Sequence, residues 1–312
     1  MTTAAPPVPS VPKTARNRLL RLEQRGMPYA LISPYFLLFA VFGLFPLGFT
    51  MWVSMHRWRL AGEKEWVGFD NYSFLLTNER FWNATGNTLG IFVMSTIPQL
   101  LLALAIASAL NKRLRFRLAI RLGILLPMVT SVVAVAVVFS HLYGTEFGLF
   151  NWVLDFFGVD NVNWRADKLP SWFAISSMID WRWTGYNAII FLAAMQTIPR
   201  DLYEAAAIDG ASPRRQFWQI TVPQLRPIII FTVFVSTMGG LTLFAEPTMF
   251  GSGLYGGGTA GQFQTVAMYI VQAFRQRNNY GLAAAAAWLL FLMILIVALI
   301  NYLFVNRIRG SR

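Results

Sequence analysis

Cysteine is absent from this 312-residue chain, and only two histidines occur, His56 and His141. Without cysteine there is no disulfide scaffold, no thiol nucleophile and no thiolate metal ligand. Two isolated histidines are too few for a histidine metal cluster, so no metal site is predicted. None of the four lysines follows a glycine, so the phosphate-binding pattern GxxxxGK[ST] is also missing. We therefore expect no cofactor bound to this chain.

Charged residues are scarce as well. They make up 13% of the chain, while 56% of its residues are apolar and 15% are aromatic. Because soluble domains carry about a quarter charged residues, this chain has too little polar surface to cover a water-exposed globule. The apolar content equally excludes a largely disordered chain. The composition predicts a membrane protein, so the net charge of +12 is expected to reflect topology and not nucleic-acid binding.

Six apolar segments are long enough to cross a membrane as helices, which takes about 20 residues. They cover residues 30–53, 87–110, 118–142, 172–198, 228–247 and 282–305. We expect an all-α polytopic membrane protein with a transmembrane domain over 30–305. The Pro-rich and then basic stretch 1–29 predicts a flexible cytoplasmic tail at the membrane surface, and 306–312 predicts a second short cytoplasmic tail.

The distribution of Lys and Arg predicts the orientation of these segments. Seventeen of the 26 lie in the two tails and in the second-to-third and fourth-to-fifth connections, against eight in the other three connections. Basic residues are enriched on the cytoplasmic side of membrane proteins, so both termini are predicted to be cytoplasmic. Six spans agree with this, because an even number returns the chain to its starting side.

The connection 199–227 carries the most specific signal in the sequence. Asp201 is expected to cap a short helix, with Glu204 three residues later completing a reciprocal cap. Gly210 can adopt the left-handed conformation that ends such a helix.

A second short helix is predicted directly after the first. Ser212 is its expected cap, Pro213 suits its first turn, and Pro223 is expected to stop it. The connection is therefore predicted to be a helix–turn–helix at the cytoplasmic face. Physical reasoning alone leaves open whether this hairpin packs beneath its own membrane helices or serves a partner.

The same connection resembles the EAA loop of bacterial ABC importer permeases. The matching residues are Glu204, Ala205, Ala206, Asp209, Gly210 and Ala211, followed by Phe217 and Pro223. Further residues agree with the maltose-type, binding-protein-dependent carbohydrate branch, and the resemblance covers about 84–305.

The resemblance implies a type I ABC importer permease fold in the bacterial cytoplasmic membrane. It implies that the EAA-loop residues form a coupling helix that docks on a cytoplasmic ATPase. This chain is then a transport subunit and not an enzyme, while two separate ATPase subunits bind ATP and Mg. The other implied partners are a second permease subunit, usually a paralogue, an extracytoplasmic sugar-binding protein, membrane lipid and the sugar itself.

Polar and aromatic residues of the fourth and fifth segments are candidates for the substrate pathway. They are Asp180, Trp183, Tyr186, Asn187, Ser236, Gly239 and Gly240. Counted at 1.5 Å per residue, Tyr186 lies about 20 Å above the cytoplasmic end of its segment. The fifth-segment group lies about 14–20 Å above its own cytoplasmic end, so the two groups meet at similar depth. Aromatic rings can cover a sugar's apolar faces, and amides and hydroxyls can pair with its hydroxyl groups.

Each candidate also has a structural interpretation. Trp183 and its neighbours could serve interhelical packing or an interfacial aromatic belt, and Asp180 could be an interfacial anchor. Glu246 is a possible outer gate, or it simply ends the fifth segment.

The main alternative function is an ion-coupled secondary sugar carrier that works without an ATPase. Such carriers place coupling carboxylates near the membrane midplane and show repeated halves, and the sequence shows neither. A membrane-embedded enzyme would need a nucleophile–base or metal constellation, for which there is no candidate.

Overall fold

The computed structural model describes residues 27–59, 64–112 and 115–309, and most of these residues are helical. The predicted tail 1–29 therefore lies almost entirely outside the described residues. The chain divides into two compact units, Met1–Val53 and Ser54–Arg312.

The described part of the first unit is a single long helix. The chain is helical from Met27 to Ser54 over 28 residues, including a π-helical turn η1 (Ala40–Leu44) followed by α2 (Phe45–Ser54). It contains no charged residue. This helix coincides with the first predicted segment and is long enough to span a membrane.

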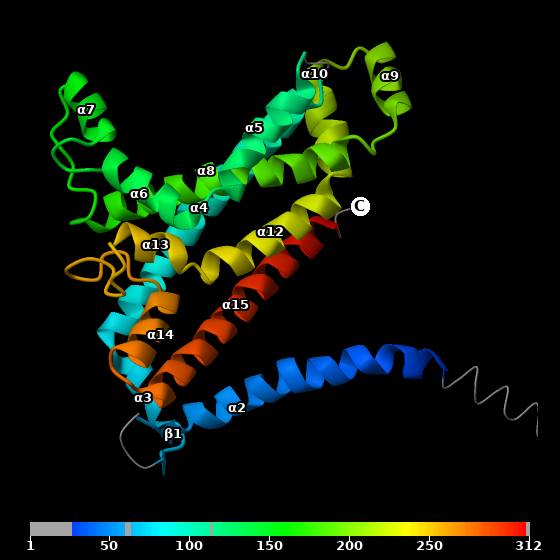
Figure 1. Cartoon of the computed structure of the whole chain (residues 1–312). Coiled ribbons are helices and arrows are strands. Elements are labelled where there is room, and N and C mark those ends of the chain that lie inside the picture. Colours follow the sequence, from blue (N-terminus) through cyan, green and yellow to red (C-terminus); the bar gives the residue numbers. More distant parts are fainter. Residues whose placement is uncertain (1–26, 60–63, 113–114, 310–312) are drawn as a thin grey trace, which may run out of the picture. The chain divides into compact units, whose positions relative to one another are not determined.

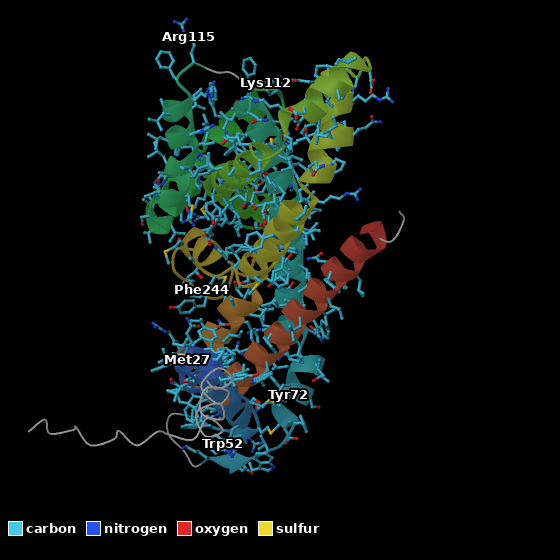
Figure 2. The ribbon with its side chains drawn as sticks, turned by 90° about the vertical axis from the view of Figure 1, so that its right-hand side faces the viewer. Met27, Trp52, Tyr72, Lys112, Arg115 and Phe244 are labelled. Atoms are coloured by element: carbon cyan, nitrogen blue, oxygen red, sulfur yellow. The ribbon has the colours of Figure 1, made fainter. Side chains whose placement is uncertain are left out.

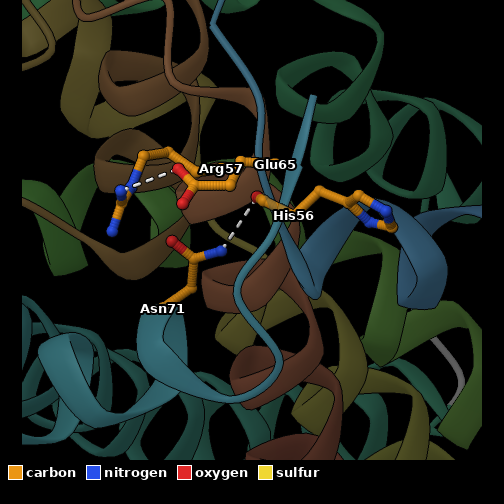
Figure 3. A network of polar contacts seen from close by, with 4 residues as sticks. All are labelled: His56, Arg57, Glu65 and Asn71. Atoms are coloured by element: carbon orange, nitrogen blue, oxygen red, sulfur yellow. Dashed lines mark hydrogen bonds and ion pairs between the residues drawn. The ribbon is translucent and has the colours of Figure 1, made fainter. Parts of the chain in front are cut away.

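The second unit opens with a short hairpin, which forms the one sheet found among the described residues (Figure 3). Strand β1 (His56–Arg57) pairs antiparallel with β2 (Glu65–Trp66). The Arg57 Nη1 to Glu65 Oε2 ion pair measures 2.9 Å. The Asn71 amide donates to the His56 carbonyl oxygen at 3.1 Å, which joins the hairpin to the helix that follows.

The remaining elements of the second unit are helices (Figure 1). In chain order they are α3 (Asp70–Thr77), α4 (Glu79–Leu110), α5 (Arg117–Val129), α6 (Val132–Leu142), α7 (Leu149–Phe156), α8 (Lys168–Met195), α9 (Arg200–Ile208), α10 (Pro213–Gln216), η2 (Phe217–Thr221), α11 (Val222–Gln224), α12 (Arg226–Leu241), α13 (Ala245–Phe250), α14 (Val266–Arg275) and α15 (Tyr280–Arg309). The second predicted segment lies in α4, which begins eight residues earlier than expected. The sixth lies in α15, which continues into the predicted C-terminal tail.

The third predicted segment, 118–142, is wrong as a single straight helix. The chain bends by 91° between α5 and α6. Thr130 leaves the helical conformation with ψ 140°, and its hydroxyl donates to the Leu126 carbonyl oxygen at 2.9 Å. Because threonine can satisfy a backbone carbonyl in this way, the helix can end within an apolar run.

The fifth predicted segment, 228–247, is also interrupted. Helix α12 ends at Leu241, and α13 begins at Ala245 after three residues outside any helix. Glu246 and Pro247 therefore belong to a separate short helix and do not end the fifth segment.

Three helices in the described residues are long and apolar enough to cross a membrane, namely 27–54, 79–110 and 280–303. Two bent pairs, α5 with α6 and α10–α11 with α12, raise this number to five if each pair counts as one span. The fourth predicted segment lies in α8, whose 28 residues reach about 42 Å. Its composition is less apolar because it contains Asp180 and Arg182.

The centre of the second unit is the pairing of α4 with α8. Gly90 of α4 lies directly against the Trp172 ring of α8, and Gly185 of α8 lies against the Ile124 backbone carbonyl of α5. A side chain at either glycine would overlap these neighbours, so the close helix crossings require glycine.

The connections fall on two sides of the second unit. In Figure 1, α3, α7, α13 and α14 lie on one side, and α9, α10 and the end of α15 lie on the other. The first set belongs to the connections predicted to face outward, and the second to those predicted to face the cytoplasm.

Candidate functional site

The helix α9 begins differently from the prediction. Its N-cap residue is Pro199, which makes no side-chain cap, and Asp201 lies in the first turn. The predicted capping role of Asp201 is therefore wrong. Its carboxylate still lies near the positive end of the helix dipole, which favours an acidic residue.

The end of α9 follows the prediction for Gly210. This residue has φ +76°. The Ala211 amide donates to the Ala206 carbonyl oxygen at 2.8 Å, and the Gly210 amide donates to that of Ala207 at 3.1 Å. These two bonds form a Schellman motif, in which a left-handed residue closes the last turn of a helix.

The second helical stretch also begins as predicted. The Ser212 hydroxyl accepts a hydrogen bond from the Arg215 amide at 3.4 Å, and Pro213 occupies the first turn of α10. Helix continues through η2 and α11 and ends at Gln224, one residue beyond Pro223. The chain then turns by 67° into α12.

The two halves of the connection differ in burial. No residue of α9 is buried, and Ile208 is 87% exposed. Phe217, by contrast, packs against the buried cluster that contains Leu225 and Phe191. A hydrogen bond of 2.9 Å between the Tyr203 and Thr221 hydroxyls joins the halves. The second half thus packs beneath its own helices, while α9 is held to it through Tyr203 and leaves Glu204 and Ala205 exposed.

A cavity of about 370 Å³ lies among α4, α8, α12 and the break before α13. We call it the central cavity. Its lining consists of Ser95, Thr96, Gln99, Ile179, Trp183, Tyr186, Asn187, Val235, Ser236, Gly239, Gly240, Thr242, Leu243, Phe244, Ala245 and Glu246. Most of this lining is apolar or aromatic, with a few converging hydroxyl and amide groups, as in sites for small polar molecules.

Six of the seven predicted pathway residues line this cavity. The predicted residues of α8 and those of α12 therefore face the same space. The seventh, Asp180, is not among the lining residues. Its Oδ1 atom is buried and has no hydrogen-bond partner within the described part of the chain.

The polar wall of the cavity includes residues that the sequence analysis missed. The Asn187 amide donates to Gln99 Oε1 at 3.2 Å, and both side chains are buried. Ser95, Thr96 and Gln99 are spaced three or four residues apart on α4, which puts them on one helix face. That spacing of polar residues within an apolar segment is the signal that could have revealed them.

Glu246 is held by Arg182 of α8. The distance from Arg182 Nη1 to Glu246 Oε1 is 2.5 Å, and the side chains are 13% and 8% exposed. The pair ties α13 to α8 at one end of the cavity. Beside it, Phe244, which Figure 2 labels, lies in the break before α13 with its ring stacked 6.0 Å from Tyr255.

Residues 88–310 match the family described as "binding-protein-dependent transport system inner membrane component". The chain belongs to this family. The match includes the connection 199–227 and every helix around the central cavity, so the predicted membership of the bacterial ABC importer permeases is confirmed. An ion-coupled carrier is accordingly contradicted.

Curated relatives extend over almost the whole chain. A trehalose/maltose transport system permease protein MalF from Thermococcus litoralis is 33% identical over 293 residues, covering 93% of this chain and 97% of the relative. A lactose transport system permease protein LacF from Rhizobium radiobacter is 34% identical over 294 residues, with the same two coverages, 93% and 97%. An arabinooligosaccharides transport system permease protein AraP from Bacillus subtilis is 32% identical, covering 98% and 96%.

Solved structures agree in fold. A chain of a bacterial ABC transporter involved in the import of the acidic polysaccharide alginate superposes with a TM-score of 0.73 at 23% identity, covering 95% of this chain and 100% of that chain. A chain of a second alginate transporter structure, in complex with an alginate-bound periplasmic protein, superposes with a TM-score of 0.74 at 24% identity. It covers 94% of this chain and 99% of that chain. The importer-permease fold is thereby established for the helical arrangement described above.

Proposed function

We propose that this chain is the membrane-spanning permease subunit of an ATP-driven importer for a sugar or oligosaccharide. The observation that carries the proposal is the central cavity. Trp183 and Tyr186 present aromatic rings, and Asn187, Gln99 and Ser236 supply amides and a hydroxyl. Rings that cover apolar sugar faces and groups that pair with hydroxyls are the combination a neutral polar ligand requires. The relatives named for maltose, lactose and arabino-oligosaccharides support the same substrate class.

We propose six spans in the bacterial cytoplasmic membrane with both termini in the cytoplasm. The bias of basic residues supports this orientation. So does the separation of the connections onto two sides of the second unit (Figure 1). In this topology α8 supplies the fourth span, and the bent pairs supply the third and fifth.

We propose that α9 is the coupling element, in which Glu204, Ala205, Ala206, Asp209 and Gly210 dock on a cytoplasmic ATPase subunit. Its lack of buried residues supports this role, since most of its surface is left open to a partner apart from the Tyr203 hydroxyl, which bonds to Thr221. The complete importer then contains a second permease subunit, two ATPase subunits that bind ATP and Mg, and an outer sugar-binding protein.

The decisive experiment measures sugar uptake and ATP hydrolysis by the complex assembled from this chain and its partners in lipid vesicles, with a panel of mono- and oligosaccharides. One or more sugars should stimulate both activities. Trp183→Ala should raise the half-saturating sugar concentration several-fold. Trp181→Ala is the matched control, because Trp181 lies two residues away on α8 and does not line the cavity. Equal kinetics for the two variants would contradict the sugar assignment of the cavity, and stimulation by none of the sugars would contradict the proposed function.

A further inference from the structure

Helix α7, between the third and fourth predicted spans, exposes a continuous apolar stripe. Leu149, Trp152, Val153 and Phe156 are spaced three or four residues apart and share one helix face. They are 51%, 66%, 38% and 79% exposed, respectively. We call these four residues the α7 stripe. Exposed apolar surface on this scale marks a contact surface.

The opposite face of α7 is firmly held. Asn151 is 1% exposed, and its amide donates to the Val162 carbonyl oxygen at 3.0 Å while its Oδ1 accepts from Trp164 Nε1 at 2.9 Å. The Phe150 ring stacks on Tyr143 with centroids 4.2 Å apart. The stripe is therefore presented by a helix whose orientation is fixed by its own chain, so it cannot turn inward to bury itself.

Exposed apolar side chains also occur on α6, which contacts α7, and at the start of α8. On α6, beside α7 in Figure 1, Val137 and Val138 are 53% and 55% exposed. On the first turns of α8, Leu169 and Phe173 are 63% and 49% exposed. In the proposed topology these side chains of α6 and α8 meet lipid near the outer end of their spans, and α7 lies in the connection between those two ends.

Charge defines how deep α7 can lie. Glu146, Asp155 and Asp160 occur around the helix, and residues 144–161 contain no Lys or Arg. Carboxylates are costly in the hydrocarbon layer but not at its boundary. Tryptophan and phenylalanine are favoured at that boundary, and an amphipathic helix lies there with its apolar face buried about 5–10 Å.

We propose that α7 is an interfacial helix whose stripe inserts into the boundary between headgroups and acyl chains of the outer leaflet. It holds the outer ends of α6 and α8 at a fixed depth in the membrane. The inference relies on the outward placement of the connection 143–167 in the proposed topology.

The absence of cysteine from this chain makes a direct test possible, because an introduced cysteine is its only thiol and can be labelled before the chain is assembled with its partners. Trp152→Cys and Phe156→Cys, in the assembled complex in lipid nanodiscs, would carry an environment-sensitive fluorophore. Asp160→Cys, four residues after Phe156 and outside the stripe, is the matched control. Brominated lipids and aqueous iodide are the two quenchers. We expect brominated lipid to quench the labels at 152 and 156 about twofold more than the label at 160, and iodide to show the reverse order.

Two results would overturn the proposal. If iodide quenched the labels at positions 152 and 156 to the same extent as the label at position 160, the stripe would face water. Protection of both positions from both quenchers would show that a protein partner covers it. Labelling of Asp160→Cys in intact cells by a membrane-impermeant thiol reagent tests sidedness separately. A cytoplasmic location would contradict the topology, while lipid quenching would still report insertion into a leaflet.

Discussion

Arg182 of α8 and Glu246 of α13 form a buried ion pair between residues 64 positions apart in the sequence, with Nη1 and Oε1 at 2.5 Å. Each charge is stabilised mainly by the other, because both side chains are almost fully removed from solvent. The pair also fixes where the short helix α13 sits relative to the cavity that Glu246 lines. Its two partners should therefore be energetically coupled.

Glu246→Gln should destabilise the protein, because it leaves the Arg182 guanidinium buried without a counter-charge. Breaking a buried pair by removing one partner costs about 3–5 kcal/mol, whereas replacing both partners by apolar residues is often neutral. In thermal unfolding of the purified protein, the double variant Arg182→Met with Glu246→Met should therefore be more stable than the single variant Glu246→Gln. The exposed pair Arg57–Glu65, with side chains 55% and 63% exposed, is the control. Arg57→Gln should cost no more than about 1 kcal/mol. Equal stability of Glu246→Gln and Arg57→Gln would refute the coupling.

Gly210→Val should abolish uptake and sugar-stimulated ATP hydrolysis while the protein still reaches the membrane. Gly210 has φ +76° and nothing within 4 Å of an added Cβ, so the penalty is conformational and not steric. A left-handed backbone costs a residue with a Cβ about 1–2 kcal/mol, and a β-branched residue fits it worst.

Gly210→Asn is the matched control for that variant, since asparagine tolerates the left-handed region. It should retain most of the uptake that Gly210→Val loses. Full activity of the valine variant would remove the support for α9 as the coupling element.

Gly239→Leu should reduce uptake without lowering thermal stability. A Cβ at Gly239 meets open space, and the residue lines the central cavity, so a longer side chain would occupy the volume proposed for the sugar. Gly123→Leu is the control on α5, because its Cβ also meets open space but lies outside the cavity lining. If transport by the two variants is indistinguishable, the cavity is not on the substrate pathway.

Gly185→Ala should impair folding more than any surface glycine variant. The added Cβ would overlap the Ile124 carbonyl group, which belongs to the backbone and cannot move aside as a side chain can. Overpacking of this kind costs about 1–3 kcal/mol. Gly86→Ala has nothing within 4 Å and should be neutral or slightly stabilising, as expected for alanine in a helix. The yield of monodisperse protein after detergent extraction gives the comparison, and equal yields would argue against a tight α5–α8 crossing.

Features governed by local chain chemistry could be predicted from the sequence. The Gly210 turn and the Ser212 cap involve hydrogen bonds between residues a few positions apart, so residue type and spacing determine them. Asp201 failed as a cap because Pro199, with its extended backbone, began the helix two residues earlier. Neither residue type nor apolar periodicity distinguishes between two such neighbouring starts.

The apolar pattern of the sequence could not predict the helix breaks at Thr130 and before α13. Each lies inside a run of apolar residues, and the bends depend on how α6 and α13 pack against each other and against α8. The Arg182–Glu246 pair likewise depends on tertiary structure. A signal for it does exist in the sequence, since ionisable residues within membrane segments usually pair with one another.

The exposure of α9 has a consequence for how the sequence of this chain can vary. Because none of its residues is buried, replacing the exposed side chains of 200–208, while keeping Tyr203 and its bond to Thr221, removes little packing from the fold. If α9 is the coupling element proposed above, the constraints on those side chains come from the partner, whereas Phe217 and Leu225 are constrained by packing within the chain. In that case the segment from Pro199 to Ala211, bounded by a proline and a left-handed glycine, is an exchangeable module whose sequence can change with a partner while the membrane helices remain unchanged.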